Sequence, residues 1–358
     1  MTNFNTPEWD KKFRSIFADI RQNKCVILVG PEILKIGSRS FRDVLRDKLD
    51  ETNNDDIAHY YERDGFFLFR DKIAKEDVQR EVVLFYQDYN LDKEITENLL
   101  LQLVRLRIHV ILSINPDTFL SDVAYKYGIK HRFAYFQHGG TAVQDVEVPS
   151  GDMPLFYNLY GSLERDNSLV LDYDDLFRLF SSLLGSPGLP PNLALALQQA
   201  KHFLFVGFDF DKWYSQLLLR LLSGEKAIRK FAVDTSEKSD NTTTFLVKQF
   251  GIEFIEDESA FLTELIRRAE VEGLFRDIME SQTPDAVRII RFLQNGDVLG
   301  GLNHLKNNEK TAQIAIMLMA QYHDLKDREA RRTIDSRDYV VQYNRIVDAI
   351  METLKTNF

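Results

Sequence analysis

Short apolar runs alternate along most of the chain with stretches whose apolar positions recur every three or four residues. The runs are continuous and rich in branched and aromatic residues, which is typical of parallel strands buried on both faces. The expected strands are 26–29, 109–113, 133–136, 155–157, 168–171, 202–207, 229–233 and 252–255. The expected helices are 8–22, 40–50, 76–88, 92–105, 173–184, 190–200, 211–222, 240–250 and 258–272. The pattern therefore predicts an α/β fold, a Rossmann-like parallel sheet with helices on both faces.

The pattern changes near residue 274, after which we expect an all-α region. Thr283-Pro284 is a typical helix start and Asn295-Gly296 a typical helix end. Two long amphipathic stretches follow, at 310–332 and 336–354. The second carries an apolar stripe that we expect to pair with another helix or with a partner chain, formed by Tyr339, Tyr343, Ile346, Ile350 and Leu354.

The charge of the chain divides at the same place. There are 45 basic and 55 acidic residues, a formal net charge of −10. The part from residue 275 onward holds 12 of each sign, so the excess of acid belongs to the first 274 residues. Because structural period and charge change together, we predict two domains, an α/β domain at 1–274 and a helical domain at 275–358.

The composition excludes several classes of function. A net acidic chain has no general positive field for phosphate backbones, so we expect no non-specific nucleic-acid binding. Cys25 is the single cysteine, which rules out an intramolecular disulfide and a cysteine-based zinc site, and we expect no metal. We find no apolar run long enough for a membrane span, and residues 1–13 carry charges instead of an apolar leader. We therefore expect a cytoplasmic protein.

Four polar segments follow expected strands. They are Gly30-Pro31-Glu32, Ser113 to Asp117, Asn158 to Leu163, and Gly207 to Asp211. The carboxyl ends of parallel strands meet at one edge of a sheet, where open α/β folds place their ligands. A nucleotide is the ligand that we expect at this rim.

In this order, the four segments resemble the motifs of the sirtuin-like domains of prokaryotic antiviral and other conflict systems. The resemblance covers about residues 20–265. In that family a Gly-Ala-Gly loop approaches the NAD phosphates, and a Thr-x-Asn-x-Asp motif supplies a key asparagine. A Leu-His-Gly-Ser motif supplies the catalytic histidine, and a Gly-x-Ser/Asp segment flanks the adenosine.

The resemblance implies a role for each matching residue. The run from Ser113 to Asp117 matches the asparagine motif, and the run from Leu159 to Ser162 matches the histidine motif with Tyr160 in place of the histidine. It implies that Asn115, Asp117 and Tyr160 lie at the reacting ribose. The residues that it implies for contact with NAD are Gly30, Glu32, Ser113, Gly161, Ser162, Gly207, Asp209 and Asp211.

Two departures from the family pattern affect the expected activity. Pro31 lacks an N–H and Glu32 adds a carboxylate where the family brings a phosphate close, which weakens the phosphate site. A phenol with a pKa near 10 is ionised in about one molecule per thousand at pH 7, a deficit of about 4 kcal/mol against a base poised near neutrality. Fast turnover with Tyr160 as the base is therefore not expected. His138, which follows an expected strand, could stand in for the missing histidine.

These residues also have purely structural interpretations. The asparagine motif could cap a following helix, and the loop at Gly30 could be a tight turn at a helix start. Tyr160 could pack in the core, Asp211 could cap the next helix, and His138 could be a solvent-facing loop residue.

The helical tail resembles the small effector-associated domains of prokaryotic conflict systems, which pair like with like. The likeness is carried by residues 314–325, 339–346 and Ile350. It implies a protein partner, or self-association into a homo-oligomer, through residues 275–358.

Three functions follow from these observations. The leading hypothesis is an effector of antiviral defence that binds NAD or an ADP-ribose derivative, acts as an NAD⁺ glycohydrolase and is coupled to a partner through its tail. The alternative is a catalytically inactive adaptor or sensor, because Tyr160 replaces the histidine. A third is a hydrolase of another nucleoside derivative, with His138 or Glu32 as its base.

Overall fold

The computed structural model describes residues 4–52, 55–89, 96–138, 145–163, 168–208, 210, 212–223, 229–233, 240–255, 257–278, 286, 289–290, 292–293, 297–308 and 310–357. The chain divides into two compact units. The first comprises Met1–Leu120 and Lys130–Arg276, and the second comprises Ser121–Ile129 and Asp277–Phe358. Residues 121–129, which the sequence pattern placed in the α/β domain, therefore count with the helical unit.

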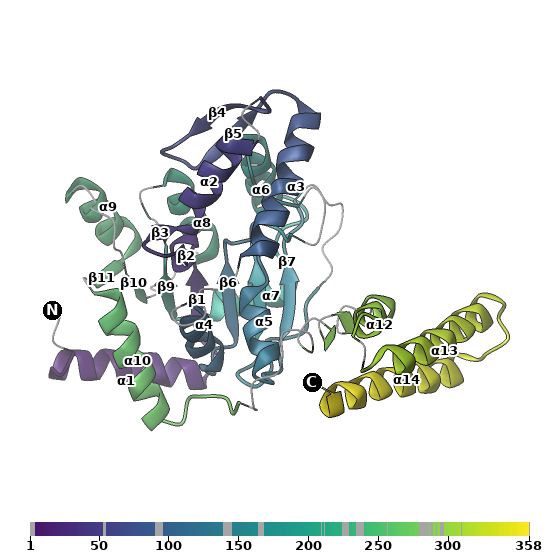
Figure 1. Cartoon of the computed structure of the whole chain (residues 1–358). Coiled ribbons are helices and arrows are strands. Elements are labelled where there is room, and N and C mark those ends of the chain that lie inside the picture. Colours follow the sequence, from purple (N-terminus) through teal and green to yellow (C-terminus); the bar gives the residue numbers. More distant parts are fainter. Residues whose placement is uncertain are drawn as a thin grey trace. The chain divides into compact units, whose positions relative to one another are not determined.

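The first unit is built on a seven-stranded parallel sheet in the order β11-β10-β9-β1-β6-β8-β7 (Figure 1). The strands are β1 (Cys25–Val29), β6 (Val110–Ser113), β7 (Arg132–Tyr135), β8 (Leu155–Asn158), β9 (His202–Val206), β10 (Arg229–Val233) and β11 (Ile252–Ile255). Central β1 pairs with β9 on one side and β6 on the other, and all five of its residues are buried. The predicted α/β, Rossmann-like class is confirmed.

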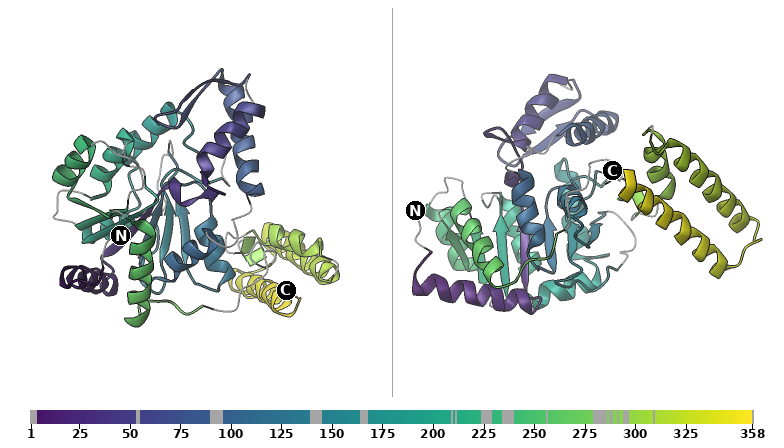
Figure 2. Two further views of the ribbon diagram at one scale, coloured as in Figure 1. Left: turned by 60° about the vertical axis from the view of Figure 1, so that its left-hand side comes forward. Right: turned by 60° about the horizontal axis from the view of Figure 1, so that its bottom comes forward.

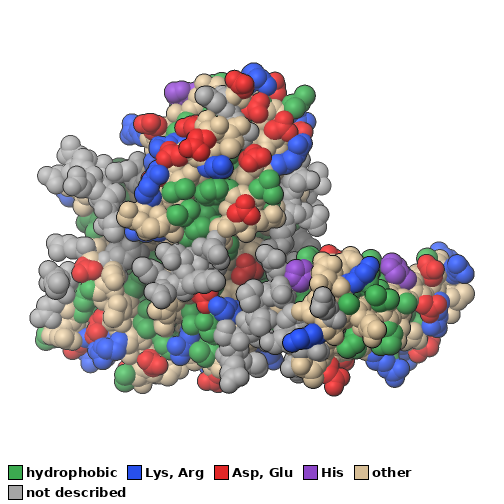
Figure 3. Space-filling model, viewed as in Figure 1, with side chains coloured by type: hydrophobic (Ala, Val, Ile, Leu, Met, Phe, Trp, Pro, Cys, Tyr) green, Lys and Arg blue, Asp and Glu red, His purple; other side chains and the backbone are tan. Residues whose placement is uncertain are grey.

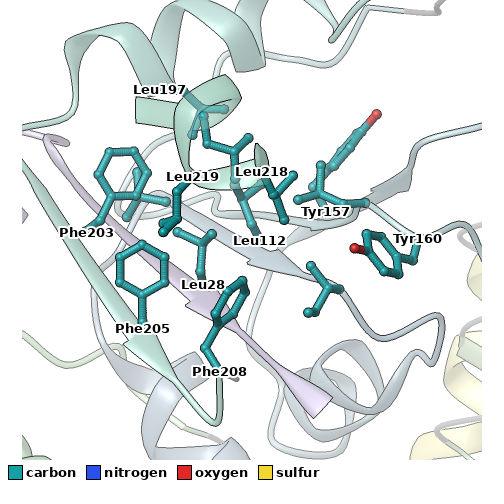
Figure 4. Close-up of a cluster of buried hydrophobic side chains, with 14 of the residues drawn as sticks. Leu28, Leu112, Tyr157, Tyr160, Leu197, Phe203, Phe205, Phe208, Leu218 and Leu219 are labelled. Atoms are coloured by element: carbon teal, nitrogen blue, oxygen red, sulfur yellow. The ribbon is translucent and has the colours of Figure 1, made fainter. Parts of the chain in front are cut away.

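Helices cover both faces of this sheet (Figure 2). One face packs against α6 (Tyr173–Leu184), α7 (Pro191–Gln199) and α8 (Trp213–Ser223), through a buried cluster drawn in part in Figure 4. The other face packs against α1 (Pro7–Arg21) and α10 (Glu258–Val271), whose Trp9 and Phe261 rings each lie 6.5 Å from the Phe231 ring of β10. Burial on both faces explains why the strand sequences are continuously apolar.

Further helices and two small hairpins lie around the sheet. The helices of the first unit are η1 (Pro31–Ile33), α2 (Phe41–Thr52), α3 (Lys72–Asp88), α4 (Thr96–Arg105) and α9 (Asp240–Phe250), whereas α5 (Phe119–Lys126) falls mainly in the second unit. The hairpins are β2 (Lys35–Ile36) with β3 (Arg39–Ser40), and β4 (Ile57–Tyr61) with β5 (Phe66–Phe69). The sequence pattern did not predict α5 or either hairpin.

One expected strand is wrong, since residues 168–171 form no strand. Instead, Leu171 O accepts a hydrogen bond from Phe67 N of the β4–β5 hairpin (3.0 Å), and the Ser168 hydroxyl bonds to the backbone of Ser162. The apolar run therefore packs outside the sheet. Directly after it, α6 begins at the predicted residue because Asp172 and Asp175 form a capping box.

The described part of the second unit is helical, with α12 (Val298–Lys306), α13 (Ala312–Ala330) and α14 (Ser336–Asn357) around one core. The stripe predicted on α14 packs inward: Ile346, Ile350 and Leu354 are buried, and Tyr339 and Tyr343 pack against the same core. The expected helix start at Thr283-Pro284 and end at Asn295-Gly296 lie outside the described residues. Within those residues, no helix has the length and apolar character that crossing a membrane requires.

Candidate functional site

The loops that follow β1 and β9 meet at the carboxyl edge of the sheet. Gly30 N donates to Val206 O (2.9 Å), and Glu32 N donates to Gly207 O (3.0 Å). A Cβ atom on Gly30 would lie 2.1 Å from Gly207 O, so both loops need a glycine for their backbones to approach. The backbone N–H groups of Gly30 and Glu32, two residues that the resemblance implied for contact with NAD, therefore bond to protein carbonyls, and Pro31 between them has no N–H.

Asn115 connects the end of β6 to this pair of loops. Its side-chain Nδ2 donates to Gly30 O (3.2 Å), and its backbone N donates to the Ser113 hydroxyl (3.0 Å). The residue is buried, at 4 % exposure. An amide side chain has two N–H donors and one acceptor oxygen, so one bond to Gly30 leaves capacity for a ligand.

Asp117 lies in the turn that leads into α5. Its Oδ1 accepts from Phe119 N (2.9 Å), and its backbone O accepts from Nδ2 of Asn158 (2.7 Å). The first bond is the helix-start interaction that the structural interpretation of the motif predicted. Asn158, at the end of β8, begins one of the four polar segments, but the sequence analysis gave it no role.

Gly161 and Ser162 form the turn that follows Tyr160. Gly161 has a φ of +86°, and a Cβ atom there would lie 1.9 Å from Ser168 O. Ser162 is fully buried, and its backbone N donates to the Ser168 hydroxyl (3.0 Å). A contact inside the protein thus accounts for the glycine of this motif, and the backbone of Ser162 is bonded to Ser168.

A cavity of about 90 Å³ opens beside Asn115. Its walls come from the loops after β1, β6 and β8, from α2 and α3, from the β4–β5 hairpin and from residues 169–171. Five residues of the predicted motifs line it, namely Pro31, Ile114, Asn115, Pro116 and Tyr160. The rest of the described lining is mainly apolar and aromatic, as in many small-molecule sites.

Arg42 on α2 is the charged residue of this described lining. Its guanidinium lies near the phenols of Tyr214 and Tyr60 and the carboxylate of Glu32. Gly65 of the hairpin turn makes room for it, since a Cβ atom there would lie 2.9 Å from Arg42 Nη1. Guanidinium groups favour carboxylate and phosphate ligands. Sequence reasoning missed Arg42 because it lies twelve positions after Gly30, in an expected helix whose pattern gave no sign of facing the rim.

Hydrogen bonds from three side chains hold the turn of the β4–β5 hairpin near this edge of the sheet. Asp64 in its turn accepts hydrogen bonds from the Tyr173 hydroxyl through Oδ2 and from the Tyr214 hydroxyl through its backbone O (3.0 Å). Lys212 Nζ donates to the carbonyl of the adjacent Arg63. The Asp64-Gly65 pair between two aromatic runs is a hairpin signal that could have identified this element from the sequence.

Tyr160 is 6 % exposed and belongs to the buried cluster below the rim (Figure 4). Burial raises the pKa of its phenol well above its usual value, with Tyr214 adding to the rise and Arg42 opposing it. The hydroxyl is therefore neutral near pH 7 and can donate a proton in a hydrogen bond, but it is a poor general base. It both borders the cavity and packs in the core, so the two sequence interpretations are compatible.

His138 and Glu32, the two candidates for a replacement base, lie outside the described lining of the cavity. His138 is buried, and its Nε2 donates to Leu169 O (3.3 Å), so it is not the solvent-facing residue that one interpretation expected. Its bond supports residues 169–171, which do line the cavity. Glu32 instead adds a negative charge near Arg42.

Two predicted site residues, Asp209 and Asp211, lie outside the described residues. Gly207 just before them has a φ of +62° and contacts the glycine loop, as described above. Among the described residues, no group of three or more histidine, cysteine, aspartate or glutamate side chains is arranged to hold a metal ion.

Comparison with known protein families finds two matches. Residues 109–255 match a SIR2-like domain, and residues 285–356 match effector-associated domain 11. A search of curated proteins found no match. The first match covers β6 to β11 and hence the Asn115 and Tyr160 motifs, whereas the Gly30 loop and Arg42 precede it.

Proposed function

Because the chain carries a SIR2-like domain followed by an effector-associated domain, we propose that it is an effector of a prokaryotic conflict system, of the antiviral kind. Its ligand in this proposal is NAD or an ADP-ribose derivative, bound at the rim of the parallel sheet. The observation that carries the proposal is the meeting of the predicted motifs at this rim, where Asn115 and Tyr160 line a cavity beside the Arg42 cation.

The cavity and its charge are compatible with part of a dinucleotide. About 90 Å³ is well below the roughly 300–1,000 Å³ of sites for drug-sized ligands. The cavity therefore suits one ring-sized portion of the ligand, with the remainder outside it. Since N–H groups of the glycine loop already bond to Val206 and Gly207, Arg42 is the group that we expect to attract the negative charge of the ligand.

The reaction that we propose is hydrolysis of NAD⁺ to nicotinamide and ADP-ribose. The glycosidic bond to nicotinamide breaks, water supplies the new oxygen on the ribose, and one proton is released. Asn115 can orient a ribose hydroxyl or the water through its amide, as the resemblance to sirtuin-like domains implies. A neutral Tyr160 does not accept the released proton, so we expect turnover to be slow.

Titration calorimetry with NAD and ADP-ribose tests the binding proposal. We expect the whole chain to bind both ligands, and Asn115→Ala to weaken binding at least tenfold by removing hydrogen bonds to the ligand and to Gly30. Asn98→Ala changes an exposed asparagine on α4 and is the matched control, with unchanged affinity. No binding by the unmodified chain, or equal binding by Asn115→Ala, would contradict the proposal.

A second function, a catalytically inactive adaptor or sensor, is favoured by the burial of Tyr160 and its raised pKa. Overnight incubation with NAD, followed by chromatography for nicotinamide, separates the two functions. Nicotinamide release by the unmodified chain that is abolished in Asn115→Ala supports the enzyme. Binding without release supports the sensor, and activity gained in Tyr160→His would show that only the base was missing.

The helical unit carries the coupling to a protein partner or to a second copy in this proposal. Its surface includes apolar side chains that are about half exposed, namely Ile316 (53 %), Met317 (54 %), Val340 (52 %) and Val341 (49 %). Apolar surface of this kind is visible as green on that unit in Figure 3. This exposed apolar surface supports assembly through the tail, because covering apolar groups with a partner removes them from water and lowers the free energy.

A further inference from the structure

The Tyr160 hydroxyl is a buried polar group that lacks a hydrogen-bond partner among the described residues. A buried hydroxyl without a partner costs free energy of folding, since it gave up hydrogen bonds to water. A phenylalanine would fill nearly the same space without this cost. The hydroxyl therefore has no stabilising role in the described structure, and its presence needs another explanation.

Neighbouring tyrosines show that the fold does satisfy phenols in this region. The Tyr173 hydroxyl donates to Oδ2 of Asp64, and the Tyr214 hydroxyl donates to the Asp64 carbonyl (3.0 Å). Tyr160 differs from them because it borders the cavity together with Asn115. Tyr160 therefore combines a hydroxyl that is unpaired among the described residues with a place in the wall of the cavity.

The surroundings of the hydroxyl define the chemistry of that partner. Arg42 lines the same cavity and lies within electrostatic reach of Tyr160. The described lining contains no carboxylate, and Glu32, whose carboxylate lies near Arg42, is outside it. An O–H group that stays protonated near pH 7 can donate but does not become an anion. A donor beside a cation favours an acceptor with negative charge, so an anionic oxygen fits better than an amine or an apolar group.

We propose that the Tyr160 hydroxyl is a ligand-binding group, which donates a hydrogen bond to an anionic oxygen of the nucleotide in the Arg42 cavity. This inference rests on the proposed function. It gives Tyr160 a role in binding the ligand, in place of the proton transfer that the resemblance implies for a histidine at this position. The anionic oxygen is either a phosphate oxygen of the dinucleotide or a carboxylate on its pyridine ring. The two sources are distinguished by the ligands of the test.

The test compares the unmodified chain with Tyr160→Phe in two measurements. In thermal melting without ligand, we expect Tyr160→Phe to melt at the same temperature or higher, because it loses an unsatisfied buried hydroxyl. In titration calorimetry with ADP-ribose, NAD and nicotinic acid adenine dinucleotide, we expect its affinity to fall about tenfold or more for the ligand that supplies the anionic oxygen. Tyr173→Phe, which removes a satisfied hydroxyl, is the control and should melt at a lower temperature.

Each outcome has a definite meaning. Weaker binding of all three ligands by Tyr160→Phe supports a phosphate oxygen, and weaker binding of the nicotinic acid form alone supports the carboxylate. If the unmodified chain binds and Tyr160→Phe binds all three equally well, the inference is wrong and the proposed function stands. A lower melting temperature for Tyr160→Phe would also overturn the inference, since the hydroxyl would then have a structural partner. Failure of the unmodified chain to bind any of the three contradicts the proposed function itself.

Discussion

Three glycines at the rim lie where the backbone of a neighbouring loop leaves no room for a side chain. Gly30 and Gly207 contact each other's loops, and Gly161 contacts Ser168. Gly161 and Gly207 also have positive φ angles, which residues with a side chain rarely adopt. At the residue scale, the glycines of the motifs therefore serve contact between loops, and a need for glycine does not by itself indicate a phosphate.

A buried histidine makes the stability of the α/β unit sensitive to acid. His109 directly precedes β6 and is 2 % exposed. Burial lowers its pKa to about 4, the Cys25 backbone opposes this change, and nearby Arg276 adds to it. Between pH 6.5 and 4 the unfolded chain binds a proton there and the folded chain does not, so stability falls as the pH falls. We expect a loss of about 3 kcal/mol by pH 4 from this residue.

Denaturant unfolding at several pH values measures this loss. His109→Gln should show a smaller decrease between pH 6.5 and 4 than the unmodified chain. A decrease remains because burial also lowers the pKa of His202, with Asp19 opposing the change. His323→Gln alters an exposed histidine on α13 and should behave as the unmodified chain does. The same slope in His109→Gln as in the unmodified chain would show that His109 is not the group responsible.

At the scale of elements, the chain beyond α10 is held against the end of α4 by a short bridge. Arg107 N donates to Leu274 O (2.8 Å), and Arg276 N donates to Arg105 O (2.7 Å). The buried Arg276 guanidinium then donates to backbone carbonyls of Val104 (2.6 Å), Leu106, Ile108 (2.6 Å) and Gly151 (2.9 Å). One side chain thus joins the end of a helix, the start of β6 and the loop before β8.

Replacing this guanidinium should destabilise the α/β unit. Arg276→Met keeps the apolar stem but leaves buried carbonyls without donors, and we expect a loss of about 3 kcal/mol or more in denaturant unfolding. Arg276→Lys should recover only part of it, because an ammonium lacks the planar fork that reaches several carbonyls. Arg107→Met removes an exposed pair with Asp152 and should cost less than about 1 kcal/mol. A loss as small for Arg276→Met as for Arg107→Met would refute the role given to Arg276.

At the scale of the whole molecule, the two units have separate apolar cores. Leu28 of β1 is buried in the core of the sheet, and Leu302 of α12 is buried in the core of the helical unit. Acidic and basic side chains are mixed on the surface over α2 and α3 (Figure 3). Each unit therefore has the interior that an independently folding domain requires.

Separate cores predict separate unfolding. Leu302→Ala removes methyl groups from a fully buried site and should destabilise the helical unit by about 2–5 kcal/mol, and Leu28→Ala should do the same to the α/β unit. Scanning calorimetry should show two transitions, with each variant lowering one of them. A single transition that both variants lower equally would mean that the units unfold together.

Most of the elements of this protein could be predicted from local pattern because their causes are local. The start of α6 depends on Asp172 and Asp175, which are three residues apart, and central β1 is apolar throughout because both faces are buried. Residues 168–171 have an equally apolar pattern but pack outside the sheet, on the distant β4–β5 hairpin. Pattern alone cannot distinguish these cases, since it does not show which partner covers an apolar run.

The sequence by itself determined the class of the fold and the order of the rim motifs, and through its resemblance to sirtuin-like domains it predicted that Tyr160 replaces a histidine. Only the tertiary structure decided what these residues contact. In the folded chain, Arg42 and the β4–β5 hairpin line the cavity. The N–H groups of the glycine loop bond to the carbonyls of Val206 and Gly207, and Tyr160 is buried. The physical reason is that periodicity and capping act over a few residues, whereas burial, pKa and hydrogen-bond partners depend on groups that are distant in the chain.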